Sequence, residues 1–395
     1  MASQPLRVAM IAPPWLSIPP VGYGGIESVL DALIPELLKL GVYIELFTVG
    51  DSMVKASKNH WLYEKGQYEF IHKPAYDSAV ISSAHMQFAL NAIARDGNFD
   101  LIHDHTILLG PMALANLDER FPPVLHTVHN PPFTVSGEKL TVPDNRPMWD
   151  QFKDVAKLYF TCISKAMVGH APQSFKKRMV PTVYNPVNVC DFPLVTEKND
   201  YFLTFARFHP SKGQALAVQA CLKLGVPLKM AGSVAGIVKY RKVVMELANP
   251  LSSYRSLVDF RYFSDEIFPY LEDGFIEHIG ELAGQTKVNV MSHAKALLAP
   301  IQWDEPFGMA TVEALACGTP VIAMNRGSMP EIVQHGVNGF LANNMTEFTS
   351  YMKRIDEIDP ETCRASVEHK FSARTIAKDY LNRYKLVLQK AKRKK

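Results

Sequence analysis

The chain has 395 residues, a formal net charge of +3, 47% hydrophobic residues and 21% charged residues. This composition excludes a disordered or a fibrous protein, and the length exceeds what one hydrophobic core usually supports, so two domains are expected. Much of the positive charge lies in residues 390–395. No basic stripe with interleaved aromatic residues occurs elsewhere, which argues against a nucleic-acid partner.

Cysteine usage and hydropathy bear on the location of the protein. The five cysteines are scattered singly without a CxxC pair, a pattern typical of a reducing compartment. No stretch approaches the roughly 20 apolar residues that a membrane span requires. We therefore expect a cytoplasmic protein, with peripheral membrane contact as the alternative. The basic residues of 176–179 and 390–395 are candidates for that contact, although solvated helix surfaces are the favoured explanation of both.

Short apolar segments rich in β-forming residues alternate with helical patterns along the chain. In the first half, strands are predicted at 6–12, 43–49, 99–103, 124–128 and 159–163. The pattern restarts with strands at 201–205, 228–231, 296–301 and 320–324, and with helices beginning near Lys212, Gly284 and Phe307. This alternation predicts an α/β protein with two Rossmann-like domains, whose parallel sheets direct their carboxyl ends toward a central cleft.

Domain boundaries follow from two further segments. Residues 181–193 are rich in Pro and Asn and cannot form a continuous helix, so the hinge is placed there. The predicted domains are residues 1–188 and 189–371. The final helical pattern, 372–395, has an apolar stripe of Ile376, Tyr380, Tyr384 and Leu388 that can dock on a domain surface.

Two candidate positions in the first half follow predicted strands. Gly24 and Gly25 open a helical pattern, and adjacent glycines let backbone N–H groups approach an anion at a helix N-terminus. A plain strand-to-helix turn explains them equally well, and Pro35 inside the pattern weakens the expected helix. His129 follows the strand 124–128 and is a candidate for substrate contact, although a single histidine in a β-rich segment is usually structural.

In the second half, Arg207 and Lys212 lie between a predicted strand and a predicted helix. Arginine offers a planar fork and lysine a point charge, a combination that suits a diphosphate. As stabilisers of a leaving group, the two cations would need no metal ion. Solvated loop cations are the alternative interpretation.

The segment from Trp303 to Ala323 contains two glutamates on one strand-to-helix unit. Glu305 precedes the helix, and Glu313 lies about two turns further along it. Carboxylates accept hydrogen bonds from hydroxyl groups, so the pair is suited to bind vicinal hydroxyls. An acid–base pair is the rival interpretation. Backbone N–H groups around Gly308 are expected to point into the same site, which adds Phe307, Gly308, Met309 and Ala310 to the candidate set.

His103-Asp104-His105 invites comparison with a metal site. In an extended segment the two histidines face one side and the aspartate faces the other. No further ligand follows at metal-site spacing, and the sequence has no Asp-x-Asp motif. A metal ion is therefore not predicted.

Taken together, these motifs resemble retaining glycosyltransferases of family 4, which have the two-domain GT-B fold. The resemblance rests on Glu305 and Glu313 with seven residues between them, and on the Pro306-Phe-Gly308 segment. It covers nearly the whole chain, because further segments follow in the order of the family, namely 24–27, 127–129, 163–165, 185–188, 207–213, 327–333 and 335–340.

The resemblance implies roles for the candidate residues. Arg207 and Lys212 would hold the donor diphosphate, Glu305 the hydroxyls of the transferred sugar, and Glu313 the ribose. His129 would lie near the C6 hydroxyl of the sugar or the acceptor, and Gly24 and Gly25 would contact phosphate. The implied reaction is hexosyl transfer from a nucleoside-diphosphate sugar, with a UDP-sugar favoured, by front-face attack with retention and without metal or other cofactor. The last helix would cross back onto the first domain.

The acceptor is left open, as a sugar, a lipid-linked molecule or a small molecule. Segments 51–73 and 132–147, where an acceptor would be chosen, match no pattern. A nucleotide-sugar epimerase shares the fold but needs its own acid and base. An NAD-dependent dehydrogenase also has tandem α/β domains, but the first loop lacks GxGxxG spacing. A silent sugar-nucleotide-binding subunit is the third alternative, against which the intact candidate residues argue.

Overall fold

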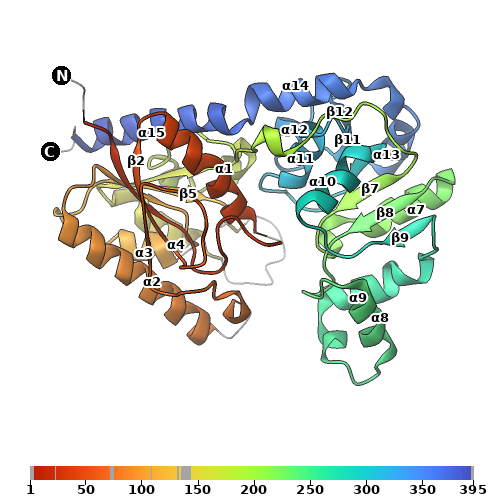
Figure 1. Cartoon of the computed structure of the whole chain (residues 1–395), viewed down its shortest axis with the longest axis horizontal. Coiled ribbons are helices and arrows are strands. Elements are labelled where there is room, and N and C mark those ends of the chain that lie inside the picture. Colours follow the sequence, from red (N-terminus) through yellow and green to blue (C-terminus); the bar gives the residue numbers. More distant parts are fainter. Residues whose placement is uncertain are drawn as a thin grey trace. The chain divides into compact units, whose positions relative to one another are not determined.

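The computed structural model describes residues 4–22, 24–71, 75–107, 109–130, 133–134 and 144–392 (Figure 1). The chain divides into two compact units. Unit 1 comprises residues 1–187 and 372–395, and unit 2 comprises residues 188–371. Each unit is built around one six-stranded parallel sheet with helices packed on it, which confirms the predicted α/β class with two Rossmann-like sheets.

The sheet of unit 1 has the strand order β3-β2-β1-β4-β5-β6. Its central strand β1 pairs in parallel with β2 on one side and with β4 on the other. The strands are β1 (Arg7–Ile11), β2 (Tyr43–Thr48), β3 (Lys58–Trp61), β4 (Leu101–Asp104), β5 (Val124–Val128) and β6 (Leu158–Cys162). The helices are α1 (Gly25–Lys39), α2 (Ala75–Asp96), α3 (Leu109–Leu114), α4 (Arg146–Asp150), α5 (Lys165–His170), α6 (Gln173–Lys176) and α15 (Ala373–Lys392).

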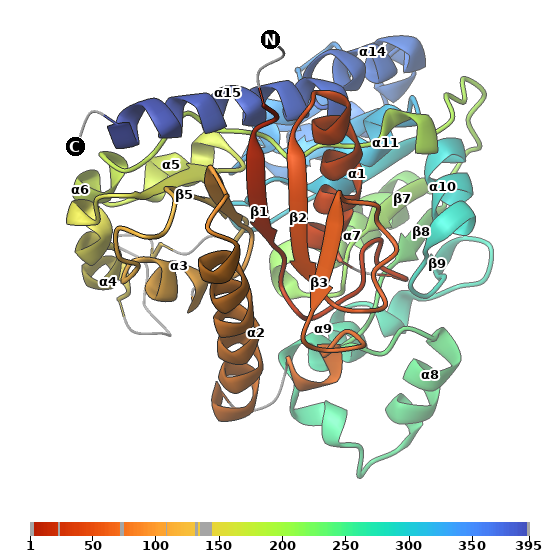
Figure 2. The same ribbon diagram turned by 60° about the vertical axis from the view of Figure 1, so that its left-hand side comes forward.

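One face of this sheet is covered by α1 and α15, which lie side by side in Figures 1 and 2. Apolar residues recur at three- and four-residue spacing along both helices, so each presents one stripe to the sheet. The stripe of α15 consists of Ile376, Tyr380, Tyr384 and Val387, all completely buried. Val387 takes the place that the sequence assigned to Leu388, which is only half-buried. The C-terminal helix thus completes the core of unit 1.

The helix α1 forms with Pro35 inside it, although the sequence analysis gave this proline as an argument against the helix. Its stripe of Leu30, Leu33 and Leu37 is fully buried against the sheet. Tertiary packing of an amphipathic face therefore outweighs the hydrogen bond lost at the proline.

The sheet of unit 2 has the order β12-β11-β10-β7-β8-β9, so β7 takes the central place that β1 has in unit 1. The strands are β7 (Phe202–Phe205), β8 (Leu228–Ala231), β9 (Ile276–His278), β10 (Ala296–Ala299), β11 (Val321–Met324) and β12 (Gly339–Ala342). The helices are α7 (Gln214–Leu224), α8 (Tyr240–Ala248), α9 (Val258–Glu266), α10 (Gly284–His293), α11 (Met309–Ala316), α12 (Met329–Ile332), α13 (Met345–Met352) and α14 (Pro360–Lys370).

In both sheets the strand order reverses beside the central strand. In doubly wound sheets, ligands bind at the carboxyl ends of the two strands that flank this switch point. In unit 1 these strands are β1 and β4, and in unit 2 they are β7 and β10. The candidate residues that follow these strands are Gly24 and Gly25 after β1, Arg207 and Lys212 after β7, and Glu305 after β10.

Surface features bear on the expected partners. Of the helices described, none combines the length and the apolar character needed to cross a membrane.

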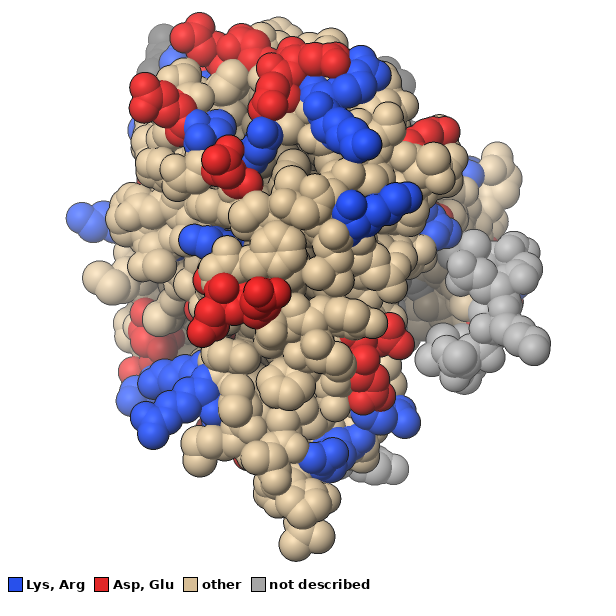
Figure 3. All heavy atoms as spheres, turned by 90° about the vertical axis from the view of Figure 1, so that its right-hand side faces the viewer, with Lys and Arg blue, Asp and Glu red and all other residues tan. Residues whose placement is uncertain are grey.

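In the basic segment 176–179, Arg178 is buried and donates from Nε to Lys153 O at 2.7 Å, so it is not available at the surface. On the face drawn in Figure 3, acidic and basic side chains are interspersed, and the coloured residues form no continuous basic surface.

Candidate functional site

The glycine-rich turn after β1 leads directly into α1. Gly24 caps the helix, and a Cβ built on it would lie 2.5 Å from Pro20 Cβ, so this position requires glycine. Nothing described lies within 4 Å of a Cβ built on Gly25. Glu27, in the first turn of α1, is buried, and burial raises the pKa of its carboxyl group to about 7. Tyr23 lies outside the described residues.

In unit 2, the candidate donor residues Lys212 and Glu305 are brought together by neighbouring strands. Lys212 ends a short 3-10 helix (Pro210–Lys212) after β7, and Glu305 lies in the loop after β10. Lys212 Nζ is 2.6 Å from Glu305 Oε2, and Trp303 Nε1 donates to the same oxygen at 2.8 Å. Lys212 Nζ also lies 5.0 Å from the centre of the Trp303 ring. No described residue forms a hydrogen bond with Glu305 Oε1, which leaves that oxygen for a hydroxyl donor.

The loop that carries Glu305 is held by the turn before α12. Ser328 donates from its backbone N–H to Glu305 O at 2.9 Å and from its hydroxyl to Phe307 O at 2.8 Å. Gly327 has a φ of +54°, and a Cβ built on it would lie 2.4 Å from Glu305 N. Only glycine therefore permits this close approach of the two loops, which fixes the backbone of Glu305.

The helix α11 begins directly after this loop. Gly308 caps it with a φ of +88°, and the first backbone hydrogen bond within the helix runs from Thr311 N to Gly308 O. The N–H groups of Met309 and Ala310 therefore lie at the positive end of the helix dipole, where an anion is stabilised. Phe307 is buried and packs edge-on against Phe371, so its side chain supports the loop and does not reach a ligand.

Glu313 lies on the second turn of α11 and is buried. Its Oε1 is 2.6 Å from Nζ of Lys287, a residue of α10. This lysine also lies over the Phe205 ring at the end of β7, 5.5 Å from its centre. The sequence analysis missed Lys287, and no motif marks it.

Arg207 has a charged partner that the sequence analysis also missed. Its Nη1 is 3.0 Å from Oδ2 of Asp259 on α9, and the guanidinium is half exposed. His209 Nε2 lies 3.7 Å from the other oxygen of the same carboxylate. Gln214 donates to Arg207 O at 2.9 Å and so ties the loop to the start of α7. Asp259 is therefore positioned to orient the guanidinium.

In unit 1, His129 follows the carboxyl end of β5 and is partly exposed. Its Nε2 lies 2.9 Å from Nδ1 of His105, which is completely buried. His103 in turn contacts His105, whereas Asp104 accepts a hydrogen bond from His126 on the other face. These contacts confirm that the two histidines of 103–105 share a face. Among the described residues, no group of three or more His, Cys, Asp and Glu side chains is arranged to hold a metal ion.

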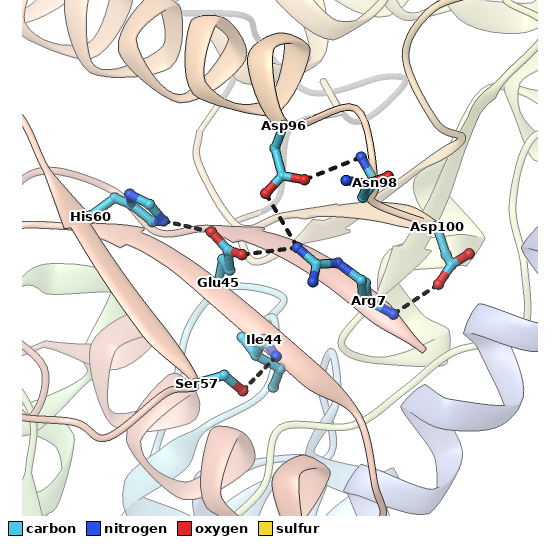
Figure 4. A network of polar contacts seen from close by, with 8 residues as sticks. All are labelled: Arg7, Ile44, Glu45, Ser57, His60, Asp96, Asn98 and Asp100. Carbon is cyan, nitrogen blue, oxygen red and sulfur yellow. Dashed lines mark hydrogen bonds and ion pairs between the residues drawn. The ribbon is translucent and has the colours of Figure 1, made fainter. Parts of the chain in front are cut away.

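A separate concavity of about 330 Å³ lies in unit 1 beside β2, β3 and α2. Figure 4 shows that three polar residues of its lining, Glu45, His60 and Asp96, have partners. Arg7 Nη2 lies 3.1 Å from Glu45 Oε1 and 3.2 Å from Asp96 Oδ2, and His60 Nε2 lies 2.7 Å from Glu45 Oε2. Arg7 begins β1, so this network lies toward the amino end of the strands. We assign it a structural role in joining β1, β2, β3 and α2.

The two Rossmann-like sheets and the paired glutamates on one strand-to-helix unit are features of GT-B glycosyltransferases. Residues 23–189 match the family model described as Glycosyltransferase Family 4, and residues 271–368 match the one described as Glycosyl transferases group 1. The two segments together span more than half of the chain. The protein therefore belongs to the glycosyltransferases of family 4, group 1, and is a glycosyltransferase.

Relatives and solved structures agree with this assignment. The chain is 23% identical over 381 residues to the putative glycosyltransferase YtcC of Bacillus subtilis, covering 89% of this chain and 83% of the relative. It is 24% identical to D-inositol 3-phosphate glycosyltransferase of Mycobacterium marinum, covering 81% of this chain and 70% of that protein.

Among solved structures, sucrose-phosphate synthase from Thermosynechococcus elongatus matches with a TM-score of 0.72 at 18% identity. The match covers 97% of this chain and 99% of that chain. Anabaena Alr3699/HepE in complex with UDP and glucose matches with a TM-score of 0.65 at 16% identity, and this match covers 95% of this chain and 98% of that chain. At these identities the likeness establishes the GT-B fold.

Proposed function

We propose that this glycosyltransferase moves a hexosyl unit from a nucleoside-diphosphate sugar, with a UDP-sugar favoured, to a hydroxyl acceptor with retention of configuration. The observation that carries the proposal is the Lys212–Glu305 contact at the carboxyl ends of β7 and β10. It joins a cation for the diphosphate and a carboxylate for sugar hydroxyls at the switch point of the sheet. The solved HepE complexes with UDP and UDP-glucose support the choice of nucleotide.

In this proposal unit 2 binds the donor. Lys212, Arg207 and the N-terminus of α11 stabilise the negative charge that develops on the leaving diphosphate. Glu305 orients the transferred sugar through its free Oε1, and Glu313, held by Lys287, accepts hydrogen bonds from the ribose. Because these cations and N–H groups supply positive charge, the proposed transfer needs no metal ion.

The proposed reaction needs no nucleophile from the protein. The acceptor oxygen forms a bond to the anomeric carbon on the face from which the diphosphate leaves, and the bond between that carbon and the phosphate oxygen breaks. The acceptor proton passes to the departing phosphate oxygen, so the nucleoside diphosphate carries away both the electron pair and the proton. Unit 1 presents His129 and binds the acceptor.

Thermal unfolding tests the donor class directly, because a ligand that binds the folded state raises the melting temperature. We expect one of UDP, GDP and ADP to stabilise the wild type, with and without magnesium, and UDP to be the one. Release of nucleoside diphosphate from the matching donor sugar then measures turnover. A shift with NAD alone would favour a dehydrogenase and overturn the proposal.

One variant and its matched control test whether Lys212 belongs to the donor site. Lys212→Met should lower turnover by about two to three orders of magnitude, as expected for removing one charge stabiliser of a leaving group. Lys353→Met, at an exposed position after α13, serves as the matched control and should leave turnover unchanged. Equal turnover in both variants would remove Lys212 from the site. Proton NMR of the product sugar tests retention, and an inverted anomer would contradict the mechanism.

A further inference from the structure

Exposed apolar side chains gather on one segment of unit 2. Of the twenty large apolar side chains that are exposed in the described part of the chain, eight lie between residues 238 and 270. This segment contains α8 and α9, which form the lower end of unit 2 as drawn in Figure 1. Single exposed apolar residues are ordinary on a protein surface, whereas a concentration of them marks an interaction site.

The most exposed part of this segment is the outer face of α8 and the loop that follows it. Val244, Met245 and Ala248 are exposed and share one face of the helix, because residues three and four positions apart lie one above the other. Leu251 follows in the loop and is 90% exposed, and Met245 is 65% exposed. We call these four residues the apolar tip.

The loop that presents Leu251 is held by polar contacts. Arg255 donates from Nε to Asn249 O at 2.9 Å and from Nη2 to Leu247 O. The backbone N–H of Leu251 donates to Asn249 Oδ1 at 3.0 Å. Because these groups of the loop are paired within the protein, Leu251 projects from a defined turn.

The exposed charges around the apolar tip have one sign. Between residues 238 and 258 the exposed charged residues are Lys239, Arg241, Lys242 and Arg255. The one acidic residue of this range, Glu246, is only partly exposed and accepts a hydrogen bond from Ser252 Oγ at 2.6 Å. On the face drawn in Figure 3, an uncharged projection at the lower end lies between two groups of basic side chains.

An anionic lipid bilayer fits this surface better than the other possible partners do. Nucleic acids are bound by basic residues together with aromatic side chains that stack on bases. The two aromatic residues of the range 238–258, Tyr240 and Tyr254, are half-buried and contact His278 and Phe260. A second copy of the chain would bring like charges together. In a bilayer, aliphatic side chains enter below the headgroups and basic side chains remain among them.

We propose that the apolar tip is a membrane-docking surface, which inserts Met245 and Leu251 into an anionic bilayer while Arg241 and Lys242 bind the headgroups. This surface is distinct from the basic segment 176–179, which has no exposed apolar side chain. The inference does not rest on the proposed function, because it concerns lipid binding by the protein without donor or acceptor.

Co-sedimentation of the full chain with lipid vesicles tests the proposal. We expect the wild type to bind vesicles made of equal parts of phosphatidylcholine and phosphatidylglycerol. It should bind vesicles of phosphatidylcholine alone at least about a hundredfold more weakly, because each basic residue near an anionic surface strengthens binding about fivefold. Failure to bind the anionic vesicles, or equal binding to both kinds, overturns the proposal whatever the variants do.

The contribution of charge is tested with two double variants that remove the same charge from unit 2. Arg241→Gln/Lys242→Gln should weaken binding to the anionic vesicles about thirtyfold, as expected for two basic residues at the lipid surface. Lys223→Gln/Lys353→Gln is the matched control, because both lysines are exposed and lie at the carboxyl ends of α7 and α13. It should change binding by no more than about twofold. Equal weakening in the two variants contradicts the assigned surface.

Insertion is tested at Leu251, with Leu222, an exposed leucine of α7, as the control. Leu251→Ser should weaken binding to the anionic vesicles about tenfold, because its side chain no longer enters the bilayer, and Leu222→Ser should leave binding unchanged. Brominated lipid should quench the added fluorescence of Leu251→Trp but not that of Leu222→Trp. Weakened binding in Arg241→Gln/Lys242→Gln with unchanged binding in Leu251→Ser would indicate a soluble polyanion, such as a nucleic acid, and overturn the bilayer.

Two further measurements complete the test. All substituted side chains are exposed, so thermal unfolding by circular dichroism should show wild-type melting temperatures, and a weakened variant that keeps this temperature has lost binding and not its fold. Analytical ultracentrifugation without lipid examines self-association. A wild-type dimer that Leu251→Ser dissociates would assign the apolar tip to a second copy of the chain and overturn the proposal.

Discussion

His85 offers a direct test of how unit 1 responds to acid. Its side chain on α2 is completely buried, and its Nε2 lies 3.0 Å from Ala12 O. Its Nδ1 has no hydrogen-bond partner among the described residues. Protonation would place a positive charge in a buried site, and burial lowers the pKa of His85 from its ordinary value of 6.5 to about 4.

The size and sign of the effect follow from proton linkage. The folded state holds His85 neutral, so below pH 6.5 the unfolded state binds more protons and the free energy of unfolding decreases. The stabilising contribution is complete above the unfolded pKa and is lost as pH falls toward the folded pKa. Integration gives a loss of about 2 kcal/mol between pH 7.5 and pH 5. Glutamine can donate to Ala12 O but does not titrate, so His85→Gln removes this loss.

Urea unfolding followed by tryptophan fluorescence measures the effect, since Trp15, Trp61 and Trp149 all lie in unit 1. Between pH 7.5 and pH 5, we expect His85→Gln to lose about 2 kcal/mol less stability than the wild type. Ile102→Val, a core change on β4, is the control and should lower stability by about 1 kcal/mol at both pH values. An equal loss in His85→Gln and the wild type would refute the argument that burial holds this histidine neutral.

Two further predictions concern Glu27 and Lys287. Burial raises the pKa of Glu27 from 4.5 to about 7, so the folded state holds this proton and stability falls as pH rises from 4.5 to 7. Between pH 5 and pH 7.5, Glu27→Gln should therefore lose about 2 kcal/mol less than the wild type in the same urea experiment, and an equal loss would contradict the raised pKa. Lys287→Met should weaken binding of the nucleoside diphosphate about tenfold by calorimetry, because Glu313 loses its charged partner. Affinity equal to that of Lys353→Met would remove Lys287 from the donor site.

The sequence predicted the central strands better than the edge strands. The bounds of β5 and β8 agree with the prediction, and those of the other predicted strands differ by a few residues. The three strands that it missed, β3, β9 and β12, are all edge strands. An edge strand is short and has only one neighbour, so it need not carry the continuous apolar segment that reveals a buried parallel strand.

For the candidate site, motif and topology together could place Lys212 and Glu305 at one edge of the sheet, because both follow the carboxyl ends of strands. Asp259 and Lys287 could not be predicted. They come from α9 and α10, and only the packing of these helices brings them to Arg207 and Glu313. The contact of His105 with His129 could not be predicted either, because the two residues follow different strands and are 24 positions apart in sequence. The sequence suggested His105 only as a metal ligand.

The place of α15 in the core of unit 1 has a consequence for synthesis. Unit 1 is discontinuous: its sheet comes from the first 187 residues, but the tyrosines that cover β4 and β5 follow the whole of unit 2. During translation the residues of a nearly complete sheet therefore emerge with one apolar face covered by α1 alone, while unit 2, which is continuous in sequence, can finish first. The nascent chain must carry that exposed face until its final helix emerges, and this interval is when chaperone binding or aggregation would act on it.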